Sequence, residues 1–82
     1  MEDNEKNALI DFGKAVKHAR KIRKMSQSDL EELTGISVTY ISSIEKGMRN
    51  PSLTSILKLC NALRLDSQIH FLMATWSKNK NG

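Results

Sequence analysis

Two short amphipathic segments joined by a single glycine stand out in the stretch Gln27–Asn50. Ser26 precedes the first segment, and Asp29 lies three residues after Ser26. The serine can therefore cap a helix while the Asp29 carboxylate lies near the positive end of that helix. Gly35 is the residue type that ends helices in the left-handed conformation, and Ser37 stands where it can cap a second helix. This order of signals predicts a helix-turn-helix.

The second of these helices is expected to run to about Lys46, to end at Gly47 and to have two different sides. Ile41 and Ile44 lie three residues apart and point the same way, so they are expected to face inward. In the first helix the inward face is assigned to Leu30 and Leu33. The side chains left on other faces of the second helix are those of Val38, Thr39, Tyr40, Ser43 and Lys46.

The same stretch carries several pieces of a known sequence pattern. They are Q-x-x-L at Gln27 and Leu30, then Gly35, then S-x-x-Y-I-S-x-I-E-x-G over Ser37–Gly47, and RNPSL over Arg49–Leu53. With these spacings the chain resembles the phage repressor/Cro-type helix-turn-helix family, also called the xenobiotic-response-element family, over about Phe12–Leu72. Within it the chain most resembles compact restriction-modification controller proteins. The family usually has Ala where this chain has Glu31.

The resemblance implies a lambda-repressor-like DNA-binding domain. It also implies an ion pair between Arg20 and Glu45 that ties the first helix to the second helix of the helix-turn-helix. In the family the last helix commonly supplies a two-fold dimer interface.

Local signals extend the prediction to an all-α bundle of five helices around the central helix-turn-helix. The outer helices are expected over Leu9–Lys24, over Leu53–Leu63 with Ser52 as its cap, and from Asp66 to about Ser77. Their predicted core side chains are those of Phe12, Ala15, Val16, Ala19, Ile22, Leu53, Ile56, Leu57, Cys60 and Leu63. The chain then divides into a flexible arm (1–8), the DNA-binding domain with a C-terminal dimerisation helix (9–77) and a flexible tail (78–82).

The charges of the chain are unevenly distributed. Thirteen basic and nine acidic side chains give a net charge of +4 in 82 residues, enough for one small domain. On the first helix the side opposite the predicted core carries Lys14, Lys17, Lys21 and Lys24. Such a basic stripe can bind DNA phosphates through counterion release, or it can be a solvated surface that binds nothing.

The sequence shows no pattern of an enzyme, metal or cofactor site. His18 and His70 stand without a Cys or carboxylate at ligand spacing, and no phosphate-binding loop or nucleophile pattern is present. The single Cys60 lies in an apolar run and is expected to be a core residue. No apolar run approaches the length of a membrane span, and Met1–Asn7 does not resemble a signal peptide. We therefore expect a cytoplasmic protein with neither a membrane partner nor a small-molecule ligand.

The expected function is sequence-specific binding of double-stranded DNA by a transcriptional regulator, with autoregulation as one use and repression as one outcome. The alternative is a helix-turn-helix module that binds a protein, as in an antitoxin or adaptor. The candidate DNA-binding residues are Gln27, Ser37, Val38, Thr39, Tyr40, Ser43, Lys46, Arg49 and Asn50. Three have structural alternatives, since Val38 could pack inside, Ser37 could act only as a cap and Asn50 could be a turn residue.

The last predicted helix carries more apolar surface than one edge of a small core needs. Phe71, Leu72 and Trp76 are therefore assigned to a homodimer interface, with Phe71 the first choice because it lies off the inward stripe. A dimer would match a pseudo-palindromic operator. The alternative is a monomer in which these aromatic side chains fold back over the first helix. RNA polymerase is a further candidate partner.

Overall fold

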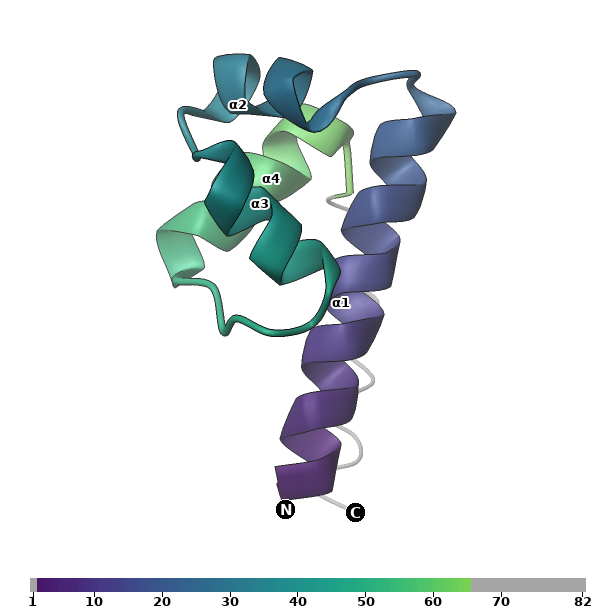
Figure 1. Cartoon of the computed structure of the whole chain (residues 1–82), viewed down its shortest axis with the longest axis vertical. Coiled ribbons are helices and arrows are strands. Elements are labelled where there is room, and N and C mark those ends of the chain that lie inside the picture. The colour runs from purple at the N-terminus through teal and green to yellow at the C-terminus, as the bar shows by residue number, and fades with distance from the viewer. Residues whose placement is uncertain (1, 66–82) are drawn as a thin grey trace.

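A computed structural model describes residues 2–65, with side chains from residue 4 onward. This part of the chain forms four helices: α1 (Glu2–Ile22), α2 (Gln27–Thr34), α3 (Val38–Glu45) and α4 (Leu53–Leu63) (Figure 1). The all-α prediction is confirmed, and residues 2–65 contain no strand. Residues 2–65 contain four of the expected helices. The fifth, expected from Asp66 to about Ser77, lies outside the described residues and stays a prediction.

The predicted limits of the first helix were wrong at both ends. It begins at Glu2 rather than Leu9, so most of the segment predicted as an arm is helical. At the other end Lys24 has a left-handed backbone (φ 55°). The Met25 amide bonds the Arg20 carbonyl at 3.0 Å, so the helix closes before Lys24.

The predicted caps of the three short helices are confirmed. Ser26 accepts from the Asp29 amide at 2.9 Å, and the Asp29 carboxylate accepts from the Ser26 amide at 2.8 Å. The Ser26 amide, and after it the Ser26 hydroxyl, lower the pKa of Asp29, because hydrogen bonds to the carboxylate favour its charged form. Ser37 and Ser52 cap α3 and α4. Gly35 takes the left-handed conformation (φ 77°) that ends α2.

The core lies between the four helices and contains most, but not all, of the predicted side chains. Its buried members are Val16, Ala19, Leu30, Ile36, Ile41, Ile44, Leu59, Cys60, Leu63 and Leu65. Cys60 is a core residue as predicted. Phe12, Ile56 and Ala62 are partly buried against this cluster.

Four predicted inward side chains are instead exposed: Ile22 (62%), Leu33 (61%), Leu53 (70%) and Leu57 (58%). On α4 the inward side is turned toward Leu59, Cys60 and Leu63. Helical spacing shows which apolar side chains lie on the same side of a helix. It does not show which of two adjacent apolar sides packs against the other helices.

On α2 a polar residue, Thr34, takes the place expected for Leu33. The Thr34 hydroxyl donates to the Leu30 carbonyl at 2.7 Å and accepts from the Ile36 amide at 3.1 Å. The buried hydroxyl thus both donates and accepts a hydrogen bond, and these bonds stabilise the turn between α2 and α3. Glu31, where the family usually has Ala, is exposed.

The crossing of α1 and α3 is unusually close. A Cβ at Gly13 would lie 2.2 Å from the Ile44 carbonyl oxygen. A Cβ at Gly47 would lie 2.8 Å from a side-chain carbon of Ile10, and the backbone there is left-handed (φ 72°). Glycine at both positions lets the end of α3 rest directly on α1, which fixes the direction of α3 in the molecule.

Candidate nucleic-acid interface

The two sides of α3 differ as the sequence predicts. Ile41 and Ile44 are buried (0% and 1% exposed). On the outward side Thr39 is exposed, whereas Val38 and Ser43 are half-buried. The Ser43 hydroxyl donates to the Thr39 carbonyl at 3.1 Å, so its oxygen can still accept a further bond. The first turns of α3 therefore present small polar and apolar groups next to each other.

A buried ion pair connects this helix to α1. Arg20 donates from Nε and Nη2 to the two carboxylate oxygens of Glu45, at 2.8 and 3.0 Å, and from Nη1 to the Met25 carbonyl at 2.8 Å. The pair expected from the family resemblance is confirmed. Bonding to the Glu45 carboxylate raises the pKa of Arg20, so the guanidinium stays charged although it is only 8% exposed.

Gln27 joins the same network. Its side-chain amide donates from Nε2 to a Glu45 oxygen at 3.1 Å, which holds the side chain at the start of α2 against the end of α3. The carbonyl oxygen of the Gln27 side chain has no bond in this network. Gln27 was predicted to lie beside a phosphate, and the structure gives it a fixed position from which it can do so.

A polar hollow surrounds Gln27 where α1, the start of α2 and the end of α3 meet. Its lining is Lys17, Arg20, Lys21, Gln27, Ser42, Glu45 and Lys46. Glu45 neutralises Arg20, and the three exposed ammonium groups of the lining are left in excess. The first amides of a helix have no partner within the helix and favour an anion. This hollow can therefore accept a phosphate group.

Tyr40 and Arg49 form a second structured part of the surface. The phenolic oxygen of Tyr40 accepts from the Ser52 amide at 3.3 Å. Bonds from the Ser55 hydroxyl and from this amide lower the pKa of Tyr40, because both favour the phenolate. The guanidinium carbon of Arg49 lies 4.7 Å from the centre of the Tyr40 ring, a cation–π distance.

The predicted DNA-binding residues lie along α3 or beside its ends, since Gln27 is bonded to Glu45 and Arg49 lies over the ring of Tyr40. Ser37 and Asn50 are exposed, the former as the cap of α3 and the latter in the loop before Pro51. The predicted dimerisation residues, which are Phe71, Leu72 and Trp76, lie outside the described residues. Sequence reasoning missed Gly13, Thr34 and Ser55. Gly13 and Ser55 depend on residues distant in the chain, Ile44 and Tyr40, whereas the partners of Thr34 lie within four residues of it. Only Thr34 gave a local signal, a hydroxyl next to the turn glycine.

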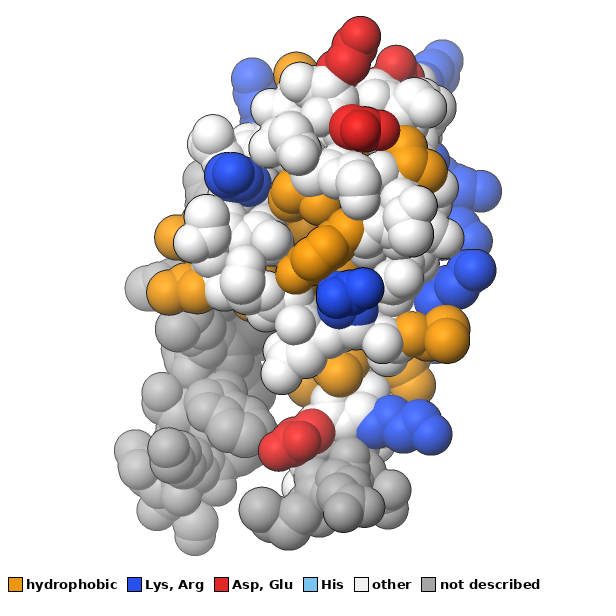
Figure 2. Space-filling model, turned by 60° about the vertical axis from the view of Figure 1, so that its left-hand side comes forward, with side chains coloured by type: hydrophobic (Ala, Val, Ile, Leu, Met, Phe, Trp, Pro, Cys, Tyr) orange, Lys and Arg blue, Asp and Glu red, His pale blue; other side chains and the backbone are white. Residues whose placement is uncertain are grey.

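Charge is unevenly spread over the face in Figure 2. Lys and Arg side chains line the right-hand edge, and most of the acidic side chains in this view lie at the upper end, where Figure 1 places α2. One acidic side chain lies at the lower end, beside a basic one. Lys14, Lys17, Lys21 and Lys24 are all exposed, as predicted from the helical spacing. The positive edge adjoins the hollow around Gln27.

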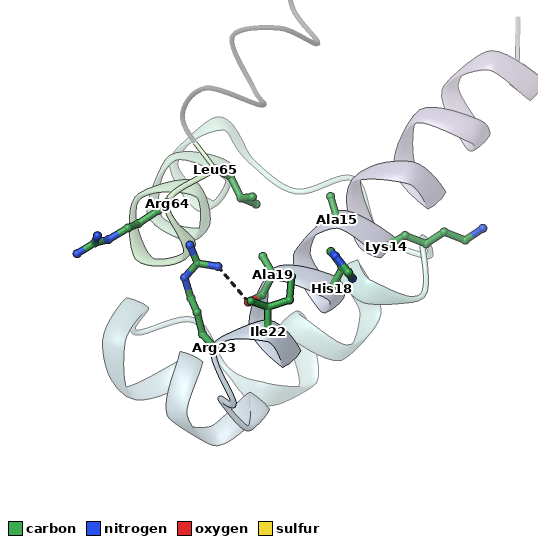
Figure 3. Close-up of a pocket in the computed structure, with 8 residues that line it drawn as sticks. All are labelled: Lys14, Ala15, His18, Ala19, Ile22, Arg23, Arg64 and Leu65. Carbon is green, nitrogen blue, oxygen red and sulfur yellow. Dashed lines mark hydrogen bonds between the residues drawn. The ribbon is translucent and has the colours of Figure 1, made fainter.

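A separate groove lies between α1 and the end of α4 (Figure 3). It is lined by Lys14, Ala15, His18, Ala19, Ile22, Arg23, Arg64 and Leu65. Arg23 turns back along its own helix and donates to the Ala19 carbonyl at 3.2 Å. Among the described residues no group of His, Cys, Asp and Glu side chains is arranged to hold a metal ion. The helices over residues 2–65 include none with the length and apolar character of a membrane span.

Comparison with known proteins places this geometry in a family. A helix-turn-helix family model matches residues 16–69. Control protein C.SmaI of Serratia marcescens is 40% identical over 48 residues, covering 58% of this chain and 57% of that protein. The transcriptional regulator SinR of Bacillus subtilis is 36% identical over 63 residues, covering 76% of this chain and 55% of SinR. The chain thus spans about half the length of the relatives it matches.

A solved structure agrees with these matches. The crystal structure of the restriction-modification controller protein C.AhdI from Aeromonas hydrophila superposes with a TM-score of 0.67 at 38% sequence identity. The superposition covers 71% of this chain and 88% of that one. An immunity repressor of Bacillus phage phi105 is also similar, at 37% identity over 51 residues. The chain therefore belongs to the helix-turn-helix family of phage repressor and controller type.

Proposed function

We propose that this chain is a DNA-binding transcriptional regulator whose helix α3 enters the major groove. The observation that carries the proposal is that α3 presents the small groups of Val38, Thr39 and Ser43 on its outward side while its Ser42 and Glu45 line the basic hollow around Gln27. Small polar and methyl groups suit base edges, and a cationic hollow beside a helix start suits a backbone phosphate. The relatives named as control protein, repressor and transcriptional regulator support the same function.

In this proposal the residues divide into two roles. Val38, Thr39, Tyr40, Ser43 and Arg49 lie near base edges. Gln27, Ser37, Lys46 and Asn50 lie near phosphates and set the position of α3 in the groove. The protein-binding alternative requires an apolar, charge-poor outward side on α3, which does not match its exposed Thr39 and Lys46.

We further propose that the protein acts as a homodimer on a pseudo-palindromic operator, because one α3 contacts too few base pairs for useful specificity. Phe71, Leu72 and Trp76 are the proposed interface. Joining two copies raises the effective concentration for the second half-site. Sedimentation of the parent and of Phe71→Ala tests this, and a parent that stays monomeric at tens of micromolar would contradict it.

Similarity to C.SmaI and C.AhdI supports a restriction-modification controller as the specific role. Such a protein would respond to its own concentration and bind upstream of its own gene. The expected cytoplasmic location belongs to this proposal, since a regulator works in the compartment that holds its DNA. Contact with RNA polymerase stays a prediction.

The function is tested by selecting duplexes from a random DNA pool and titrating the selected site at several salt concentrations. Lys46→Ala should weaken binding to all duplexes alike and lower the salt slope by about one unit, as expected for one lost phosphate contact. Lys58→Ala is the matched control, because Lys58 is an exposed lysine on α4 that does not line the hollow. Enrichment of no sequence by a folded parent would refute the proposed function.

A further inference from the structure

Arg49 has an unusual setting for an exposed arginine. It lies in the loop between α3 and α4, a position where a long side chain is normally free to take many conformations. Ordering such a side chain when DNA binds costs free energy. The two ends of this loop are fixed, since Gly47 rests on Ile10 and Pro51 is buried. The remaining freedom of Arg49 is therefore mainly that of its side chain.

Tyr40 limits that freedom. It packs partly against the core, and its phenolic oxygen is bonded by the amide of Ser52 at the start of α4. This bond connects the end of the Tyr40 side chain to the cap of α4. The Arg49 guanidinium carbon lies 4.7 Å from the centre of this ring.

The geometry of stacking preserves the binding capacity of Arg49. A guanidinium that stacks on an aromatic ring uses its flat face, while its N–H donors lie in the plane at its edge. Those donors are the groups that can fork onto a guanine or a phosphate. A lysine at this position would have neither the flat face nor the fork.

We propose that Tyr40 is a positioning residue that holds Arg49 in the orientation in which it reads one base pair. This inference rests on the proposed DNA-binding function and changes the role expected for Tyr40. Its oxygen accepts at the α4 cap and the Arg49 guanidinium lies over its ring, so in this proposal it acts on specificity through Arg49.

The first test needs no DNA. In the NMR spectrum of the free parent protein, the methylene protons next to the Arg49 guanidinium should be shifted upfield by the Tyr40 ring current. Tyr40→Leu should abolish this shift, whereas Tyr40→Phe keeps the ring and should retain it. Arg49 signals at ordinary positions in the parent, or unchanged signals in Tyr40→Leu, would overturn the proposal.

The second test is a double-mutant cycle on the selected duplex and on its single-base variants. Tyr40→Leu and Arg49→Ala should each lower the preference at the same base pair roughly tenfold, the effect of one lost bidentate base contact. The double variant should lose no more than Arg49→Ala alone. Tyr40→Phe should keep the preference, because the ring that carries the stacking remains.

Two controls separate the possible failures. Circular dichroism must show that Tyr40→Leu is folded. If it is not, the NMR spectrum of the parent still tests the proposal, because Arg49 signals at ordinary positions would overturn it. Arg23→Ala also removes an arginine, but from the groove between α1 and α4, and should leave base preference unchanged. Additive losses in the cycle would overturn the role of Tyr40 alone, whereas a parent that selects no duplex would refute the proposed function.

Discussion

The inner side of α3 is closely packed against α1, whereas its outer side is exposed or half-buried. On the inner side, α3 rests on α1 with buried Ile41 and Ile44, a closed ion pair and a crossing that admits no Cβ at Gly13. On the outer side Thr39 and Arg49 are exposed, and the side chains there are held by nearby hydroxyls, by one amide and by a contact between Arg49 and an aromatic ring. The inner side fixes where α3 points, and the outer side can vary without moving it.

This difference separates two classes of substitution. Changes on the inner side should reduce the free energy of unfolding, because close-packed interiors and buried charges tolerate little. Changes on the outer side should leave the unfolding free energy almost constant and alter DNA binding. Five substitutions test the comparison, from the largest expected loss of stability to the smallest.

Glu45→Ala should have the largest effect. It removes the only carboxylate bonded to Arg20 in the described network and leaves a buried guanidinium without its counter-charge. Breaking a buried pair from one side typically costs about 3 kcal/mol or more. Urea unfolding followed by circular dichroism measures the loss. Glu31→Ala, an exposed acidic residue on α2, is the control and should change stability by less than about 0.5 kcal/mol.

Gly13→Ala should come next. The added Cβ would lie 2.2 Å from the Ile44 carbonyl oxygen and 2.9 Å from that of Glu45, so α1 and α3 must move apart. Overpacking of this kind costs about 1–3 kcal/mol, which exceeds the gain of up to about 1 kcal/mol from replacing glycine in a helix. Thermal and urea unfolding give the net loss. A variant as stable as the parent would show that the crossing is not close.

Gly35→Ala is the matched comparison for Gly13→Ala. No atom lies within 4 Å of a Cβ at Gly35, so only its left-handed backbone (φ 77°) opposes the change. The cost should be about 1 kcal/mol, and Gly35→Asn should recover part of it because Asn tolerates this conformation. Gly13→Asn should recover nothing, since the obstacle there is space.

Ser26→Ala should cost about 1 kcal/mol by removing the cap of α2. The same change should weaken the pH dependence of stability. Because the folded state lowers the pKa of Asp29, its carboxylate stabilises the fold above the ordinary pKa of 3.8, and this contribution is lost as the pH falls through the lowered value. Unfolding between pH 5 and about pH 2 measures it, with Asp29→Asn as the variant in which this part of the pH dependence should be absent.

Thr39→Ala should have the smallest effect on stability, less than about 0.5 kcal/mol, because the side chain is exposed. It should nevertheless weaken binding to the selected duplex and change preference at one base pair, as expected for a hydroxyl and methyl group at a base edge. Titration of parent and variant on the same duplexes decides this. Unchanged affinity and preference would remove Thr39 from the interface.

Several features that depend on residues close together in the sequence were predicted correctly, whereas features that depend on distant residues were not predicted from local patterns. The caps at Ser26, Ser37 and Ser52 and the stop at Gly35 were predictable because each depends on residues within one helical turn. The pair between Arg20 and Glu45 came from family resemblance, since nothing local joins residues 25 positions apart. The inward assignment of Leu33, Leu53 and Leu57 failed because an apolar stripe faces inward only where another helix covers it.

The sequence by itself determined the local structure of this protein: where α2, α3 and α4 begin and end, and which side of α3 is apolar. Those features are encoded by capping side chains and by the helical period, which act over a few residues. The tertiary structure alone decided that α3 rests on Gly13, that Gln27 is held by Glu45 and that Arg49 lies over the ring of Tyr40. Each of these contacts joins different segments of the chain, whose relative positions exist only once the core has closed.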